Sequence, residues 1–218
     1  MPLIYKIIDS PQSTLAVWKI TESIDELRER MDISDTQISA KLDRMHPKRQ
    51  IEWLTSRTLL CSLLGDDNVS NIKNDSFGKP YHEHTDANIS ISHTTGYVAV
   101  YISDKIIGID IQQISPKIKS IAHKFIDLNS LHELHADDHI ESMHYFWGAK
   151  ECMYKCYGQK KLDFKAHLKV QLGDMKNGDK SLRYPFTTTG MISKNLYQME
   201  FSITGLKVLD SLLVYAHN

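Results

Sequence analysis

The chain has 218 residues, of which 41% are hydrophobic and 24% charged, and its formal net charge at pH 7 is −1. A near-neutral charge argues against binding of nucleic acid through bulk positive charge, and the absence of a run of about 18 apolar residues argues against a membrane-spanning helix. The first residues lack the apolar core of a signal peptide, and the three cysteines have no framework spacing. Both features lead us to expect a cytoplasmic protein with reduced thiols.

The N-terminal part of the chain predicts two strands followed by helices. Residues 1–9 and 14–20 are rich in β-branched and aromatic residues, which favour strands. Thr21 is the expected N-cap of a short helix. Residues 48–60 predict a longer amphipathic helix that ends before Gly65. Its expected buried stripe consists of Ile51, Leu54, Thr58 and Cys61.

A second face of this longer helix carries Arg49, Trp53 and Arg57, which follow one another at intervals of four. On the residues alone, two solvated arginines are the simpler interpretation.

The middle of the chain predicts an irregular loop and a strand hairpin. Gly and Pro punctuate residues 77–81, which expose Lys79 beside Pro80. Residues 88–92 and 97–102 alternate as strands around a turn. The adjacent Ser92 and His93 suggest a hydrolase. However, neighbours on a strand point to opposite faces, and no G-x-S-x-G motif surrounds them, so a nucleophile–base pair is not expected.

The next predicted strand, residues 106–112, contains an unusual carboxylate. Three isoleucines alternate with Gly108, Asp110 and Gln112, which therefore share the opposite face. A carboxylate among isoleucines must be paired, hydrogen-bonded or bound to a metal, unless it caps a loop at the strand end. Gly108 on the same face indicates that some group approaches the strand closely.

Residues 142–157 predict a helix on which Trp147, Glu151 and Lys155 form one stripe. Taken alone, this segment is more simply an exposed helix with one surface ion pair. Lys150 points to a different face and is expected to be structural or near a nucleotide. Cys152 and Cys156 are expected in the core. The apolar face of the helix consists of Met143, Phe146, Ala149, Cys152, Met153 and Cys156.

The other C-terminal predictions are a helix over 118–125, a polar turn over 174–179, and strands over 162–172, 184–189, 197–204 and 211–217. The helically spaced His132, His135 and His139 lie in a polar segment without neighbouring thiolates, so no zinc site is expected there.

Two of these segments together resemble a known family. Ile107-Gly108-Ile109-Asp110, followed by Trp147-Gly148-Ala149-Lys150-Glu151 and Lys155, is similar to the paired motifs of the 4′-phosphopantetheinyl transferases of the surfactin-activating type. The motif resemblance covers residues 49–155. It implies an α+β fold of two similar halves in a pseudo-twofold arrangement, here 1–105 and 106–218, with the active site between them. A duplicated chain of this kind is expected to be a monomer.

The resemblance also implies a reaction and its participants. The 4′-phosphopantetheine arm of coenzyme A passes to a serine of an apo acyl or peptidyl carrier protein, and adenosine 3′,5′-bisphosphate leaves (holo-acyl-carrier-protein synthase activity). Mg²⁺ is the expected cofactor, since it neutralises charge on the pyrophosphate. Coenzyme A is expected to contact Arg49, Arg57, Lys79, Pro80, Ser92, His93 and Lys155.

The expected metal ligands are Asp110 and Glu151, and Gln112 stands where many members have a third acid. An amide can still offer an oxygen or orient a water, but it lowers the negative charge, so Gln112→Glu is expected to tighten metal binding. Glu151 takes the serine proton, directly or through a water on the metal, and Lys155 steadies the developing charge. Asp110, Glu151 and Lys155 are therefore the expected catalytic residues.

Three alternatives stay open at this point. The first is a non-catalytic relative that binds carrier proteins or coenzyme A. The second is a metal-dependent phosphodiesterase that uses Asp110 and Glu151. The third is a structural α+β domain with accidental motif matches. The presence of Gln112 in place of a third acid is the observation that supports the first alternative. The identity of the carrier protein and the residues around the adenine cannot be inferred from the motifs.

Overall fold

The computed structural model describes residues 3–31, 33, 35–66, 68–126, 139–171 and 185–218. These residues form a mixed α+β structure that contains three antiparallel sheets. The chain divides into two compact units, Met1–Asp104 and Lys105–Asn218. The boundary expected from the sequence lies between residues 105 and 106. Within the described residues, no helix is both long and apolar enough to cross a membrane.

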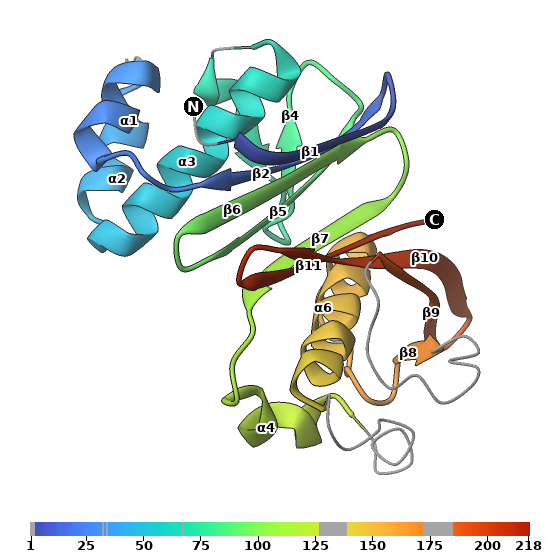
Figure 1. Ribbon diagram of the computed structural model, residues 1–218. Helices are drawn as coiled ribbons and strands as arrows, with labels where there is room; N and C mark the ends of the chain where they lie inside the picture. The colour runs from blue at the N-terminus through green and yellow to red at the C-terminus, as the bar shows by residue number, and fades with distance from the viewer. Residues whose placement is uncertain (1–2, 32, 34, 67, 127–138, 172–184) are drawn as a thin grey trace. The chain divides into compact units, whose positions relative to one another are not determined.

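The first unit contains a four-stranded sheet in the order β1-β2-β6-β5 (Figure 1). The prediction of four strands is confirmed, but the strand predicted over 88–92 extends two residues further. Pairing continues to Thr94 opposite Tyr97, so only Thr95 and Gly96 form the turn, and Gly96 has φ 81°. The strands are β1 (Leu3–Ser10), β2 (Ser13–Lys19), β5 (Asn88–Thr94) and β6 (Tyr97–Ser103).

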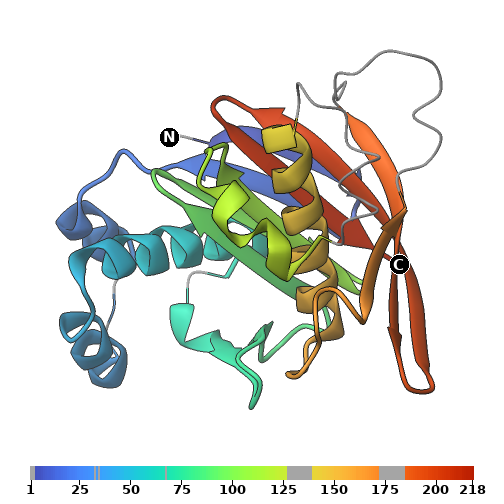
Figure 2. The ribbon, with the colours of Figure 1, turned by 90° about the horizontal axis from the view of Figure 1, so that it is seen from below.

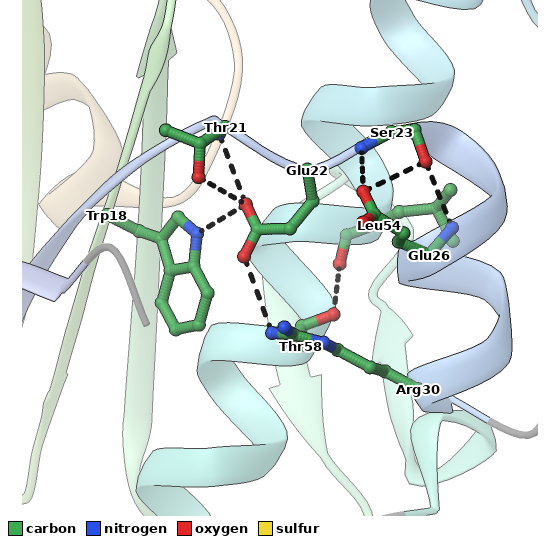
Figure 3. Close-up of polar contacts among 8 residues, drawn as sticks. All are labelled: Trp18, Thr21, Glu22, Ser23, Glu26, Arg30, Leu54 and Thr58. Carbon is green, nitrogen blue, oxygen red and sulfur yellow. Dashed lines mark hydrogen bonds and ion pairs between the residues drawn. The ribbon is translucent and has the colours of Figure 1, made fainter.

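The connection from β2 into α1 (Ile24–Met31) is held by two carboxylates (Figure 3). Glu22 accepts hydrogen bonds from the indole of Trp18 and the backbone N–H of Thr21. The prediction that Thr21 caps the helix is wrong, because Ser23 and Glu26 form a reciprocal capping box. The Ser23 N–H donates to Glu26 over 2.7 Å, and the Glu26 N–H donates to the Ser23 hydroxyl over 3.2 Å.

Helix α3 (Pro47–Leu64) confirms the longer helix predicted in this unit, and it ends at Gly65 with φ 67°. The buried surface of α3 is wider than the single buried stripe predicted for this helix. Leu54 and Cys61 are buried as expected, whereas Ile51 and Thr58 are half-buried. A helix α2 (Thr36–Asp43), capped by Asp35, precedes it and was not predicted.

The predicted loop over 77–81 is in fact the end of a hairpin. β3 (Ile72–Asn74) follows the short 3₁₀ helix η1 (Val69–Asn71) and pairs with β4 (Pro80–His82). Asp75 closes the turn, since its side chain accepts hydrogen bonds from the backbone N–H groups of Phe77 and Lys79. Pro80 stands at the first position of its strand, where no ladder donor is lost.

The second unit contains a five-stranded sheet in the order β7-β11-β10-β9-β8. Strand predictions near 106–112, 197–204 and 211–217 are confirmed, and the strand predicted to begin at 184 is described from Phe186. The predicted strand over 162–172 begins only at Leu168, because Asp163 caps a turn by accepting from two backbone N–H groups. The strands are β7 (Ile107–Gln113), β8 (Leu168–Gln171), β9 (Phe186–Lys194), β10 (Tyr197–Val208) and β11 (Ser211–His217).

The helix predicted over 118–125 is shorter than expected, with one turn of α4 (Ile118–Ile121) followed by the 3₁₀ helix η2 (Ala122–Lys124). Helix α6 (His139–Tyr157) confirms the other helix predicted in this unit. Cys152 and Cys156 are buried free thiols in the core, as expected.

Helix α6 lies along β7 and β11, as Figure 2 shows from below. The prediction that some group approaches Gly108 closely is confirmed, and that group is the backbone of α6. A Cβ at position 108 would lie 2.1 Å from the carbonyl oxygen of Cys152 and 2.7 Å from its carbon. Only glycine therefore allows the helix to pack at this depth on β7.

Replacing Gly108 by alanine is expected to lower the free energy of unfolding by about 3 kcal/mol, because the clashing atoms are backbone and cannot rotate away. Denaturant unfolding measures this loss. Gly96→Ala is the matched control: its Cβ would meet nothing within 4 Å, so only the positive φ opposes it, at a cost of about 1 kcal/mol. Equal losses in the two variants would show that the helix does not press on the strand.

Candidate functional site

Asp110 lies on β7 at the edge of its sheet, facing α6, and only 8% of it is exposed. Lys155 reaches it from α6. The Nζ atom of Lys155 lies 3.3 Å from Oδ1 of Asp110 and donates to the carbonyl oxygen of Ile109 over 2.6 Å. One ammonium therefore compensates the buried carboxylate and also satisfies a backbone acceptor beside it. Asp110 is paired, which is one of the three states expected for it.

Glu151 shares this site, one helical turn before Lys155. Burial raises the pKa of Glu151, the nearby negative charge of Asp110 raises it further, and Lys155 opposes both effects. The two carboxylates thus interact although they lie far apart in the sequence. Because the pKa of Glu151 is raised overall, Lys155 alone does not offset burial together with the second carboxylate, so the site favours a further positive charge.

Gln112 and His144 complete the site. The Gln112 amide nitrogen donates to Oδ2 of Asp110 over 3.0 Å and to the backbone carbonyl of His144 over 2.9 Å. The amide oxygen lies 2.5 Å from Nδ1 of His144. The prediction that Gly108, Asp110 and Gln112 share a face is confirmed, since all three face α6.

The donor chemistry of these residues fits a hard divalent cation. Within the described part of the chain, no three His, Cys, Asp or Glu side chains cluster as a metal group. Two carboxylates suffice for Mg²⁺, however, because Mg²⁺ is commonly held by one or two carboxylates together with waters and substrate phosphates. Asp110 and Glu151 are the residues that would hold it. Whether Gln112 also offers oxygen depends on its amide orientation.

The first unit contains a cavity of about 960 Å³. Four cationic side chains line it against two carboxylates, so its charge favours an anionic ligand. Gly78, Pro80, Trp53 and Ile91 add apolar surface, and Ser56, Ser70 and Asn74 add neutral polar groups. The charged side chains of the lining are Lys41, Arg49, Arg57, Lys73, Asp35 and Glu52, and His93 lies among them.

Arg57 is the most unusual side chain of this cavity. It is 7% exposed, so the interpretation of a solvated arginine is wrong at this position, and burial lowers its pKa to about 10. Its guanidinium lies 4.8 Å from the centre of the Trp53 ring and donates to the Ser56 hydroxyl. Among the described residues, its buried Nε atom has no hydrogen-bond partner. Protein covers this Nε atom, so an anion in the cavity would accept from the part of the guanidinium that lines it.

Arg49 and His93 lie together at the cavity wall, and a buried carboxylate joins them. The Nη1 atom of Arg49 lies 2.6 Å from Nε2 of His93 and 3.4 Å from Glu52. His93 Nδ1 lies 3.3 Å from the same Glu52 oxygen. Since arginine can only donate, His93 Nε2 accepts and its Nδ1–H points to Glu52. Arg49 itself remains largely exposed, as a solvated arginine would be.

Other expected site residues lie elsewhere. Ser92 is buried and does not line the cavity, and its neighbour His93 is exposed, so the two point apart as predicted. Lys79 lines a second cavity of about 460 Å³, with Pro80 at the edge of both. Lys150 donates to the carbonyl oxygen of Phe164 over 2.6 Å, which is a structural role. His132 and His135, and the side chain of His139, lie outside the described residues.

Sequence reasoning missed Glu52 and His144. A glutamate three residues after Arg49, inside an otherwise apolar run, was the available signal for the first. His144 precedes the motif helix stripe by one turn and had no signal of its own, because its partner Gln112 lies 32 residues away.

No protein-family model matches the chain, and no curated protein sequence matches it.

The raised pKa of Glu151 makes a prediction for the metal-free protein. A carboxyl whose pKa is raised on folding binds more protons in the folded state, so stability falls as pH rises above the unfolded pKa. Glu151→Gln removes this penalty. At pH 7.5 without divalent metal, the variant is expected to have a higher melting temperature than the wild type, and the difference should shrink as pH falls towards 4.5, the unperturbed pKa of glutamate.

Thermal unfolding in a chelator across this pH range makes the measurement. Glu200→Gln, at an exposed position of β10, is the control and should show no pH-dependent difference. A Glu151→Gln variant that is less stable than the wild type at every pH would contradict the prediction.

Proposed function

We propose that the protein transfers the 4′-phosphopantetheine arm of coenzyme A to a serine of an apo acyl or peptidyl carrier protein, with Mg²⁺. The observation that carries this proposal is the ion pair of Lys155 with the almost buried Asp110, one helical turn from Glu151 on α6. Those three residues stand at the positions that the resemblance assigns to the reaction. Two carboxylates and an ammonium are also what a phosphoryl-transfer site requires.

The proposed chemistry breaks one P–O bond and forms another. The serine oxygen bonds to the β-phosphorus of coenzyme A, and the bond to adenosine 3′,5′-bisphosphate breaks. Mg²⁺ would neutralise charge on the pyrophosphate oxygens. Glu151 receives the serine proton, directly or through water, and its raised pKa improves it as a base near neutral pH. Lys155 stands beside Asp110 as a compact positive charge.

The cavity of the first unit is proposed to bind the phosphorylated nucleotide of coenzyme A. Its volume is in the range of small-molecule sites. Arg57 offers a terminal phosphate a charged donor group in the cavity lining, and Arg49 supplies further donors at the wall beside His93. Lys79 and Pro80, on the hairpin of β3 and β4, are also proposed to contact coenzyme A.

The remaining expectations belong to the same proposal. Each unit combines an antiparallel sheet with one long helix, α3 or α6, which supports two related halves in a pseudo-twofold arrangement. We further propose a cytoplasmic monomer that acts on carrier proteins and binds no nucleic acid.

Intact-mass spectrometry of an apo carrier protein tests the proposal. After incubation with the protein, coenzyme A and Mg²⁺, the carrier is expected to gain one phosphopantetheine on its serine, and chelation should abolish the gain. Asp110→Asn and Glu151→Gln should each reduce the rate at least a thousandfold, since each removes a charge needed in the transition state. Glu200→Gln should leave the rate unchanged.

Two outcomes would reject transfer. Hydrolysis of coenzyme A without a carrier would favour the phosphodiesterase. Coenzyme A binding with no turnover on any of several apo carriers would favour the non-catalytic relative.

The nucleotide cavity has its own prediction. Arg57→Ala should raise the KM for coenzyme A about tenfold or more, because a charge-assisted hydrogen bond contributes about 1.5–3 kcal/mol. The KM for dephospho-coenzyme A, which lacks the 3′-phosphate, should change little. Arg44→Ala, an exposed arginine outside the cavity lining, is the control. An effect of Arg57→Ala on kcat alone, or an equal rise of both KM values, would show that Arg57 does not bind this phosphate.

A further inference from the structure

The Gln112 side chain has only one chemically reasonable orientation. One end of its amide lies 3.0 Å from Oδ2 of Asp110 and 2.9 Å from the backbone carbonyl oxygen of His144. Both neighbours are acceptors, so this end must be the nitrogen. With the amide reversed, an oxygen would face two other oxygens and both hydrogen bonds would be lost.

His144 secures the other end of the amide. The Gln112 oxygen lies 2.5 Å from His144 Nδ1, which must carry the proton that joins them. His144 Nε2 lies 2.9 Å from the backbone nitrogen of Ser115 and 3.0 Å from its carbonyl oxygen, so it accepts from the first in the neutral ring and donates to the second in the protonated ring. Burial lowers the pKa of His144, although the hydrogen bond with Ser115 and the charges of Asp110 and Glu141 raise it. In either protonation state, Nδ1–H donates to the Gln112 oxygen.

Helix α6 is shaped to accept this amide. A Cβ at Gly148 would lie 2.9 Å from the amide nitrogen of Gln112 and 2.8 Å from a methyl carbon of Val214. His144 is 5% exposed, so water competes poorly for its contact with Gln112. The ring and the backbone carbonyl of His144 therefore hold the amide, and Gly148 leaves the space that it occupies.

We propose that Gln112 is not a metal ligand but a fixed hydrogen-bond donor that orients Asp110, and that His144 is the positioning residue that fixes it. The inference rests on the proposed metal-binding role of Asp110. Donation to Oδ2 holds one carboxylate oxygen, while Oδ1 faces Lys155. The Gln112 oxygen is turned to His144 and away from Asp110. The amide therefore lacks the negative charge of a third acid, but it restricts the orientation of the Asp110 carboxylate.

The variant that discriminates is His144→Leu. If Gln112 were an oxygen ligand, removal of His144 would release its oxygen, and metal binding would tighten or stay unchanged. Under our proposal the amide loses its anchor and Asp110 loses its orientation, so the dissociation constant for Mn²⁺, used in place of Mg²⁺, should rise about tenfold. Gln112→Glu does not discriminate, because an added carboxylate strengthens metal binding under either view.

His144→Asn is the matched rescue. Asparagine places an amide N–H near the position of the ring Nδ1, so the contact with Gln112 is retained while the contact with Ser115 is lost. Its Mn²⁺ affinity should remain near that of the wild type. Both variants are expected to lower the melting temperature, so a purely structural role of His144 would reduce stability in both and change the Mn²⁺ affinity in neither.

The experiment combines two measurements on the full chain. Solvent exchange of the Gln112 side-chain amide protons, followed by NMR without metal, should be slow in the wild type and His144→Asn and fast in His144→Leu. Electron paramagnetic resonance titration with Mn²⁺ then gives the affinities. Tighter or unchanged Mn²⁺ binding in His144→Leu overturns the inference alone. Failure of the wild type to bind Mn²⁺ overturns the proposed metal site, and the inference with it.

Discussion

The close approach of α6 to β7 is the constraint on which the second unit depends. The strand has no side chain at Gly108, where the helix backbone passes, and the helix has none at Gly148, where the Gln112 amide lies. Packing at this depth brings helix side chains against an edge strand whose carboxylate is almost buried. Lys155 can then reach both Asp110 and the carbonyl of Ile109. The cluster of charges is therefore a consequence of backbone proximity.

Buried charge without full compensation is the feature that both units share. In the second unit, burial raises the pKa of Glu151, the negative charge of Asp110 raises it further, and one lysine opposes both effects. In the first unit, Arg57 is buried with an unsatisfied Nε and a lowered pKa. Each arrangement costs stability in the free protein. A cation beside the carboxylates of the second unit and an anion beside Arg57 of the first unit would relieve these costs, which is why we interpret both as ligand sites.

Much of this could be predicted from the sequence because periodicity places side chains on faces. The alternation of β7 puts Asp110 and Gln112 together, and helical spacing puts Glu151 and Lys155 on one stripe. Contacts between residues that are distant in the sequence follow no such periodicity, so the sequence pattern does not predict them. The burial of Arg57 depends on how many sides of α3 are covered, and the bond from His144 to Gln112 joins distant residues. At the N-terminus of α1, two neighbouring residues could serve as the cap, and Ser23 forms it with Glu26 instead of Thr21.

The central claim of the proposed function is that coenzyme A and Mg²⁺ bind to the protein together, with Asp110 among the residues that hold the metal. Calorimetric titration of the protein with coenzyme A, with and without Mg²⁺, tests it most directly. Two ligands that bind together change each other's affinity for the protein by the same factor. We predict that Mg²⁺ tightens coenzyme A binding in the wild type and has no effect in Asp110→Asn, which still binds coenzyme A. Equal affinity with and without Mg²⁺ in the wild type would contradict the account.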